Sequence, residues 1–379
     1  MIYGIILHII LMDNNKEGNK FMKKIIISSF IMLSSIFTLD AKADRLDDVI
    51  KNAYINKSSV INYVDEKREY RDFSEFTTSL KNKLNTNLLD LLRSGINKDI
   101  YIVSGIKTVS LDNEYTVDLV YDNIKMNPSE YLSTEKKVKD KVKKDLLLRK
   151  NKIEFICEMS SDSSTQYMEG ILKAIYNDRT RSGNDGNYIE YILKQYSTKG
   201  SYIYGNLVKI EFLPKYRESL AQTKYVDKEV EKIIKSLKFT KKTSTKDKVI
   251  KVHNIVSNII SYDKSFKNFT AYDGLKTGKA VCQGYSLLMY NILQKVGVDC
   301  MIVSGKGING TEEELHAWNL VKVGKKWYHV DVTFDTPVTN TGQKVTNTNY
   351  LLKGTKDFKN HKMMSKPKVK IATVGLKLN

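Results

Sequence analysis

The segment that most limits what this chain can fold into is GKAVCQGYSLLMYNIL, residues 278–293, which joins a reactive side chain to a helix. Apolar residues recur there every three or four positions and predict a helix that opens around Cys282 and Gly284. Backbone N–H groups at a helix start lack partners and carry the positive end of the helix dipole, so they favour a thiolate over a thiol. The alternative is that Cys282 is a small buried residue without a chemical role.

A β-hairpin is predicted after this helix. Residues 314–335 read ELHAWNLVKVGKKWYHVDVTFD. Alternating side chains predict strands over 315–323 and 326–334, joined by a tight turn at Gly324 and Lys325.

The register of this hairpin brings an imidazole to a carboxylate. With a two-residue turn, Trp318 faces Asp331, and His316 lies diagonally from Asp331 on the same face of the sheet. An aspartate in that place can fix the tautomer and orientation of the ring, and the second ring nitrogen can then face a thiol. The cysteine, histidine and aspartate of one catalytic constellation therefore follow one another along the chain.

Three stretches, AYDGLKTG, GKAVCQGYSLLMYNILQKVGVDC and HAWNLVKVGKKWYHVDVTFD, resemble in this order the core of the bacterial transglutaminase-like superfamily. The likeness covers about residues 245–336 and implies a papain-like fold. It also implies that Cys282 is the nucleophile, His316 the general base and acid, and Asp331 the partner that orients the ring.

The resemblance leaves two aromatic residues with open roles. Tyr272 lies where many relatives carry a tyrosine, and it is expected either to shape the oxyanion site with the backbone N–H of Cys282 or to pack in the interior. Trp318, like Trp327, is expected in the core and the cleft wall. A histidine that relatives often carry is Phe269 here, so no role of that ring is transferred.

The remaining histidines and one acid have structural alternatives. His329 shares by strand parity the face of the predicted site and competes with His316, although a packed or exposed ring is the default in WYHVD. His253 and His361 are expected to be structural or solvated. Asp335 is expected to be either a supporting acid or a turn residue.

The whole chain is expected to be an α+β protein, with a papain-like transglutaminase-core domain at 245–379 after a mixed helix and strand region at 44–240. A polar stretch without periodicity, 238–248, marks the boundary, and Ser244 is expected to cap the helix that follows it. Apolar spacing predicts the helices of the mixed region, and alternation predicts its strands. The predicted helical stretches cover 46–54, 76–84, 88–96, 134–148, 188–196 and 225–237, and the predicted strands cover 99–111, 114–126 and 201–216.

A pattern recurs within the mixed region. The strand-to-helix segments 117–146 and 208–237 have the same length, which predicts a duplication into related units at 45–150 and 151–240. Few residues match between them, so coincidence is the alternative.

Charge limits the partners that this chain can have. Its 379 residues include 62 Lys and Arg against 43 Asp and Glu, a formal net charge of +19, which suits an anionic neighbourhood. The lysines are scattered and the sequence has no strip of arginine and aromatic residues, so we expect a cell-wall or membrane surface rather than nucleic acid. The alternative is a solvated lysine-rich surface without a charged partner.

The number and spacing of the cysteines argue against a fold held by disulfide bonds or by a metal ion. Cys157, Cys282 and Cys300 are too few and too widely spaced for a disulfide framework or a zinc cluster. We therefore expect at least one free thiol, no metal and no cofactor.

The first residues predict export. From Met22 the chain has two lysines, an apolar stretch and the small-residue sequence AKA, so residues 22–43 are expected to be a cleaved signal peptide. A membrane anchor is the alternative, but the apolar stretch is shorter than the roughly 20 residues that span a bilayer. Residues 1–21 are expected to be an upstream extension from a misassigned start codon.

These observations together predict a secreted or cell-surface thiol enzyme that acts on protein or peptide amides through an acyl-enzyme. Water as the acceptor gives a protease or amidase, and a lysine amine gives an isopeptide crosslink. The sequence has no acidic loop like the calcium sites of animal transglutaminases. The alternative from another class is a noncatalytic wall-associated scaffold or binding protein that retains a papain-like core.

If the signal peptide is cleaved, the mature chain should begin at Asp44, directly after the AKA sequence. Mass spectrometry of N-terminal peptides from the culture supernatant tests this expectation. An intact form that stays embedded in the cells would contradict cleavage. If the mature chain is retained only by surface charge, a higher salt concentration should release it.

Overall fold

The computed structural model describes residues 38–41 and 46–378, except 97, 113, 162, 179–180, 205, 310–311, 340 and 342. The expected upstream extension (1–21) lies outside the described residues, and so does the expected signal peptide (22–43) apart from Thr38–Ala41. The chain divides into two compact units, Met1–Tyr131 and Leu132–Asn379.

The elements of the first unit are, in chain order, β1 (Thr38–Ala41), α3 (Leu46–Asn56), β2 (Val60–Val64), α4 (Phe73–Ser94), β3 (Ile100–Leu111), β4 (Glu114–Met126) and the 3-10 turn η1 (Pro128–Glu130). The four strands form one sheet in the order β1-β2-β4-β3. β1 runs parallel to β2, whereas β4 is antiparallel to both of its neighbours. The helical stretches and the hairpin predicted for this region are confirmed, with 76–84 and 88–96 joined in the single helix α4, and β1 and β2 are additions to them.

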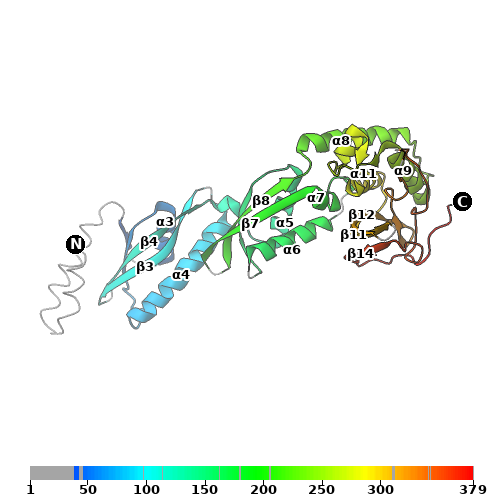
Figure 1. The fold of residues 1–379 in the computed structure, drawn as a ribbon. Helices are drawn as coiled ribbons and strands as arrows, with labels where there is room; N and C mark the ends of the chain where they lie inside the picture. Colours follow the sequence, from blue (N-terminus) through cyan, green and yellow to red (C-terminus); the bar gives the residue numbers. More distant parts are fainter. Residues whose placement is uncertain are drawn as a thin grey trace. The chain divides into compact units, whose positions relative to one another are not determined.

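The long helix α4 covers this sheet (Figure 1). Its N-cap Asp72 accepts a hydrogen bond from the backbone N–H of Glu75, and Gly95 ends it in the left-handed conformation with φ 66°. Its buried side chains recur every three or four residues, and the Phe76 ring stacks on Tyr115 of β4 with 3.7 Å between ring centroids. This apolar stripe holds the helix on the sheet.

The second unit, together with the strand at the division between the units, contains in chain order β5 (Tyr131–Leu132), α5 (Glu135–Leu147), β6 (Ile153–Glu158), α6 (Ser164–Tyr176), α7 (Asn187–Ile192), β7 (Leu193–Tyr204), β8 (Leu207–Tyr216), α8 (Leu220–Ser236), α9 (Thr245–Ile259), β9 (Ser261–Tyr262), α10 (Ala271–Thr277), β10 (Lys279–Ala280), α11 (Cys282–Lys295), β11 (Cys300–Asn309), β12 (Glu312–Val323), β13 (Lys326–Val330) and β14 (His361–Met363). Its sheets have the strand orders β5-β6-β8-β7, β10-β9 and β13-β12-β11-β14. The chain is thus an α+β protein, as predicted.

The two sheets that precede α8 follow one plan. In each, a helix, a strand, a second helix and two long antiparallel strands follow one another, and the last strand lies between the other two. The repeat runs from α3 to β4 and again from α5 to β8, with α7 as an addition in the second copy. The helix Glu135–Leu147 therefore begins the second copy, whereas the sequence pattern assigns it to the first.

α5 and α6 form a core with the second sheet. Val138 and Val142 of α5 and Leu172 of α6 are buried together with Phe155 of β6 and Ile210 of β8. β6 and α6 are not among the elements predicted from the sequence. The helix expected at 188–196 ends at Ile192, and the chain continues as β7.

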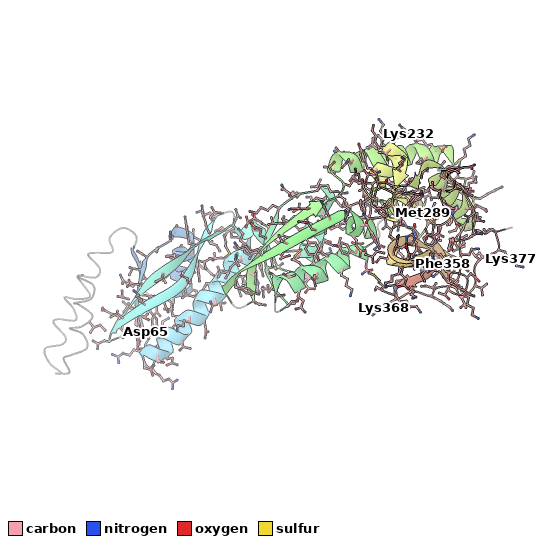
Figure 2. The ribbon with its side chains drawn as sticks, viewed as in Figure 1. Asp65, Lys232, Met289, Phe358, Lys368 and Lys377 are labelled. Atoms are coloured by element: carbon pink, nitrogen blue, oxygen red, sulfur yellow. The ribbon has the colours of Figure 1, made fainter. Side chains whose placement is uncertain are left out.

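The last sheet is buried on both faces. Along β11, Cys300 and Ile302 point into the core around α11, whereas Met301 and Val303 point into a second core that includes Trp318. Met289 of α11 and Phe358, both labelled in Figure 2, mark these two cores. A sheet covered in this way fixes its strand register, because a slip by one residue would exchange the two faces.

α11 is the central helix of this region. Its residues from Gly284 to Gln294 are all buried, which places it among its neighbours rather than on the surface. The core around it also includes Tyr188 and Ile192 of α7 and Val226 of α8. The segment 238–248 connects α8 to α9 within this same compact unit, so the domain boundary expected there stays a prediction.

The hairpin is shorter at its far end than predicted. β13 ends at Val330, whereas a strand to 334 is expected from the sequence. The backbone N–H groups of Thr333 and Phe334 donate to Asp331 Oδ1, and these bonds turn the chain away from the sheet. The turn at Gly324 is confirmed, with φ 61° at the glycine and Val323 paired to Lys326.

In the part of the chain that the structure describes, no helix combines the length and the apolar character that a bilayer crossing requires.

Gly284 should tolerate no side chain. A Cβ there would lie 2.5 Å from Ala280 Cβ and 2.9 Å from the Thr270 carbonyl oxygen. Gly284→Ala should therefore lower the free energy of unfolding by about 1–3 kcal/mol. Gly170, on the exposed side of α6, has nothing within 4 Å of a Cβ, so Gly170→Ala should raise it by about 0.5–1 kcal/mol. Urea unfolding of both variants tests this contrast, and equal effects would contradict it.

Candidate active site

Cys282 occupies the first position of α11. The N-cap residue Val281 makes no side-chain hydrogen bond to the first turn, although its carbonyl accepts the Gly284 N–H at 2.9 Å. The Cys282 thiol is half-buried, whereas Cys157 and Cys300 are buried. Burial raises the pKa of Cys157 to about 11. Among the three thiols, Cys282 combines access with the positive end of a helix.

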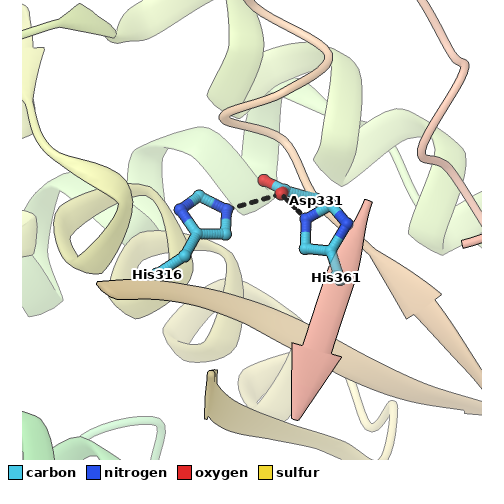
Figure 3. A group of neighbouring side chains, drawn as sticks. All are labelled: His316, Asp331 and His361. Carbon is cyan, nitrogen blue, oxygen red and sulfur yellow. Dashed lines mark hydrogen bonds and ion pairs between the residues drawn. The ribbon is translucent and has the colours of Figure 1, made fainter. Parts of the chain in front are cut away.

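His316 lies between this thiol and a carboxylate. His316 Nε2 is 2.6 Å from Asp331 Oδ2, which confirms the contact expected from the hairpin register (Figure 3). The Cys282 thiol is close enough to the same ring to help raise its pKa. Because Nε2 is occupied by Asp331, Nδ1 is the nitrogen that remains for the thiol. The three residues thus have the connectivity of a cysteine, a base and an orienting acid.

The charges of His316 and Asp331 stabilise each other. Burial opposes a charge on His316, but the Asp331 carboxylate and Cys282 outweigh it and raise the pKa of the His316 ring. Burial likewise opposes a charge on Asp331, but His316 and then His361 hold its pKa below the ordinary value. The structure therefore favours an ionised Asp331 beside a protonated His316.

Space for the His316 ring comes from a glycine on the neighbouring strand. A Cβ on Gly307 of β11 would lie 3.1 Å from His316 Cγ and 3.1 Å from Phe334 Cζ. The Phe334 ring is itself 4.7 Å from the His316 ring between centroids. The imidazole is therefore enclosed between β11 and the turn that follows β13.

His361 joins the same carboxylate from β14. Its Nε2 is 2.8 Å from Asp331 Oδ2, and its side chain is 1% exposed (Figure 3). β14 reaches this position by pairing with β11, with Gly307 opposite His361. The structure thus removes His361 from solvent and adds it to the site, which the sequence pattern around it does not indicate.

His316, Asp331 and His361 also offer ligand atoms within 4.8 Å of one another, an arrangement that could hold a metal ion. In the structure the two rings instead approach the carboxylate at hydrogen-bonding distance. Since a metal-bound imidazole nitrogen must be unprotonated, an ion here would displace both N–H groups that Asp331 accepts. The geometry fits hydrogen bonding at the carboxylate.

His329 and Trp318 form a pair of their own. The indole Nε1–H of Trp318 donates to His329 Nδ1 at 3.0 Å, and Phe358 stacks on the His329 ring with 4.3 Å between centroids. Burial lowers the pKa of His329 to about 4. Trp318 is 1% exposed, and its donor is used by His329, so it lies in the core behind His316. His329 does not replace His316 at Asp331.

His253 and Asp335 form a second buried pair. His253 Nε2 lies 2.9 Å from Asp335 Oδ2, and neither side chain is exposed to solvent. Asp335 Oδ1 accepts the backbone N–H of Tyr350, and Ser257 and Thr336 join their hydroxyls at 2.8 Å. These bonds tie the turn after β13 to α9. Asp335 is therefore a supporting acid that fixes the turn carrying Asp331.

Three tyrosines differ in their relation to the thiol. The expected oxyanion candidate Tyr272 is half-buried and packs edge-on against Tyr225 with 5.4 Å between centroids, which is a packing role. Tyr262 and Tyr191, which no sequence pattern indicates, lie close enough to Cys282 to interact with a charge on its thiol. Gln283 Nε2 donates to the Tyr191 carbonyl at 2.7 Å, which ties α7 to the residue after Cys282.

Comparisons with known proteins identify the region that carries this geometry. Residues 233–332 match the model of the transglutaminase-like superfamily core. A stretch of 98 residues is 32% identical to the Kyphoscoliosis peptidase of Homo sapiens and covers 24% of this chain and 15% of that protein. The chain thus spans well under two thirds of that curated relative.

Solved structures with similarity to this chain include one described as a TGase. It is 16% identical with a TM-score of 0.27, and the match covers 65% of this chain and 68% of that one. LapG of Legionella pneumophila is 14% identical with a TM-score of 0.25, over 37% of this chain and 71% of its own.

Asp331→Asn should lower the pKa of His316. The variant removes the main charge that raises this pKa but keeps the burial that opposes it, so the ring should titrate near or below its ordinary value of roughly 6.5. In the wild type, the raised pKa stabilises the fold at pH values below the ordinary pKa of the ring. This contribution is lost as the pH rises through the raised pKa, and the variant should lack it.

NMR titration of ¹⁵N-labelled histidine rings measures this change. Burial lowers the pKa of His329 to about 4, so this ring serves as an internal reference whose pKa should stay low. An unchanged His316 titration in Asp331→Asn would contradict the carboxylate as the source of the shift.

Proposed function

Because residues 233–332 belong to the transglutaminase-like superfamily, we propose that this chain is a papain-like thiol enzyme that opens amide bonds of proteins or peptides through an acyl-enzyme. The observation that carries the proposal is the connection of Cys282, at the start of α11, through His316 to the buried carboxylate of Asp331. Cys282 lies beside His316, His316 is hydrogen bonded to Asp331, and Asp331 also accepts a hydrogen bond from His361.

In the proposed first step, Cys282 Sγ attacks the carbonyl carbon of an amide. The carbonyl oxygen takes up negative charge, and the backbone N–H of Cys282, at the first position of α11, is the proposed donor to it. His316 gives its proton to the amide nitrogen as the C–N bond breaks, so ammonia or an amine leaves and a thioester remains. Asp331 keeps the ring in the orientation that this transfer needs.

In the second step, His316 takes a proton from the acceptor while that acceptor attacks the thioester, and Sγ leaves as the thiolate. A lysine amine as the acceptor forms an isopeptide crosslink, and water forms a carboxylate. Both outcomes use the same three side chains, so the acceptor that reaches the thioester decides the product.

The alternative class is a noncatalytic scaffold that retains a papain-like core. Such a protein has no need of a half-buried thiol held beside a paired histidine. The hydrogen bond between His316 and Asp331, with Cys282 beside the same ring, therefore supports the enzyme. Alkylation by iodoacetamide separates the two, because a scaffold should show equally slow reaction at its three cysteines.

We propose further that the enzyme acts outside the cell or at its surface. The lysine-rich N-region, apolar stretch and AKA sequence of residues 22–43 support export. The excess of basic over acidic residues supports association with an anionic wall or membrane surface, and the scattered lysines do not favour nucleic acid. Proteins or peptides that reach that surface are the proposed substrates.

The assay that tests the function incubates the wild-type protein with a glutamine-containing protein and a labelled primary amine. Mass spectrometry then follows amine incorporation, which indicates transglutaminase activity, and new peptide termini, which indicate a protease. Cys282→Ala should abolish both products, and His316→Ala should slow acylation by several orders of magnitude. Asp331→Asn should cost less than the loss of the cysteine, because the ring can still reach the thiol.

Full activity in Cys282→Ala would overturn the assignment of the nucleophile, whichever product forms. A wild-type protein that is inactive toward a broad set of protein amides would favour the scaffold.

A further inference from the structure

The Asp331 carboxylate has four donors around it. Oδ1 accepts the backbone N–H groups of Thr333 at 2.9 Å and Phe334 at 3.1 Å. Oδ2 is 2.6 Å from His316 Nε2 and 2.8 Å from His361 Nε2. A carboxylate offers about four lone-pair positions, so this one is fully used by the protein.

The tautomer of His361 follows from these contacts. An ionised carboxylate only accepts hydrogen bonds, so His361 Nε2 must carry the proton that it shares with Asp331. Its other nitrogen, Nδ1, is buried and has no partner among the described residues. A second proton would create an unpaired N–H donor in the interior, which is costly, so the ring is held neutral.

The charged and titratable groups around His361 agree with a neutral ring. Burial lowers the pKa of His361, and His316 acts in the same direction, against the Asp331 carboxylate. His329 on β13 interacts with His361, and Tyr350 lies 5.5 Å from it between ring centroids. His361 is therefore a hydrogen-bond donor whose charge stays constant while His316 gains and loses protons.

Packing fixes where this donor points. The Phe358 ring stacks on His361 with 3.9 Å between centroids and 23° between planes, and Phe334 lies 4.7 Å away. The backbone of His361 is paired opposite Gly307 in the same sheet that carries His316. The ring is thus held from β14, an element independent of the hairpin that carries His316.

We propose that His361 is a positioning residue for the reaction, which holds Asp331 Oδ2 toward His316 through its Nε2–H. The inference rests on the proposed function. Without His361, His316 would be both the ring that Asp331 orients and the sole side-chain donor to Oδ2, so each would depend on the other. His361 supplies a hydrogen-bond donor whose protonation does not change during the reaction. It lies outside residues 233–332, so the family match does not assign it this role.

Two substitutions separate a donor from a packed ring. His361→Phe keeps an aromatic ring to stack on Phe358 but has no N–H for Asp331. His361→Gln loses the ring but keeps an amide N–H that can reach the carboxylate. His361→Leu removes both and shows the full loss. Melting curves of all three variants establish that the proteins compared are folded.

The experiment measures the rate of Cys282 alkylation by iodoacetamide in the full chain between pH 5 and 9, followed by mass spectrometry of each cysteine. Thiolate at low pH requires the protonated His316 that Asp331 stabilises. We expect His361→Phe and His361→Leu to slow alkylation at pH 6 by about tenfold and to move the rise in rate to higher pH. His361→Gln should recover most of the wild-type rate.

The outcomes are distinct. A wild-type rate in His361→Phe, or a His361→Gln protein as slow as His361→Leu, would mean that the ring only packs and would overturn the inference. Wild-type Cys282 that reacts no faster at pH 6 than Cys157 and Cys300 would overturn the proposed function itself. A loss in the Phe variant with recovery in the Gln variant supports both.

Discussion

The carboxylate of Asp331 is the point on which the site depends. A buried negative charge is expensive unless it is paired and hydrogen bonded, and here the protein supplies two ring nitrogens and two backbone N–H groups. Hydrogen bonds to a charged group each contribute roughly 1.5–3 kcal/mol, so four of them can offset its burial. The turn after Val330 exists because two of those donors belong to it, and that turn also carries Asp335, which ties it to His253 on α9.

The position of Cys282, the proposed nucleophile, depends on a different constraint, which is the burial of α11. A helix surrounded by core on all sides cannot shift without disturbing its neighbours, so its first residue is placed accurately. Gly284 permits this, because the helix start approaches Ala280 and the Thr270 carbonyl more closely than a side chain would allow. The hairpin and the helix are then joined directly, since Ser286 donates to the Ala317 carbonyl and Asn319 donates to that of Ser286.

The electrostatics of the site follow from its burial. His316 is 8% exposed and Asp331 is 1% exposed, so the interaction between them is little screened by water. Neither group would be charged in such a place alone, and each is stabilised by the other. Burial raises the pKa of Tyr191 and Tyr262, and Cys282 adds to the rise in both, so their hydroxyls lie close to the same group. The chemistry is therefore a property of the group, whose members titrate together.

The sequence alone determined the features that depend on local spacing. A helix period placed Cys282 at the start of α11, and the two-residue turn at Gly324 fixed the register that joins His316 to Asp331. Only the tertiary structure decided the partners that come from distant segments. His361 follows a long irregular stretch after β13, and its pairing with β11 has no periodic signal. Tyr191 lies near Cys282 because α7 packs into the same core as α11 and the Tyr191 carbonyl accepts from Gln283. Local sequence fixes the direction of a side chain within its own element, whereas contacts between distant elements depend on how their apolar faces pack together.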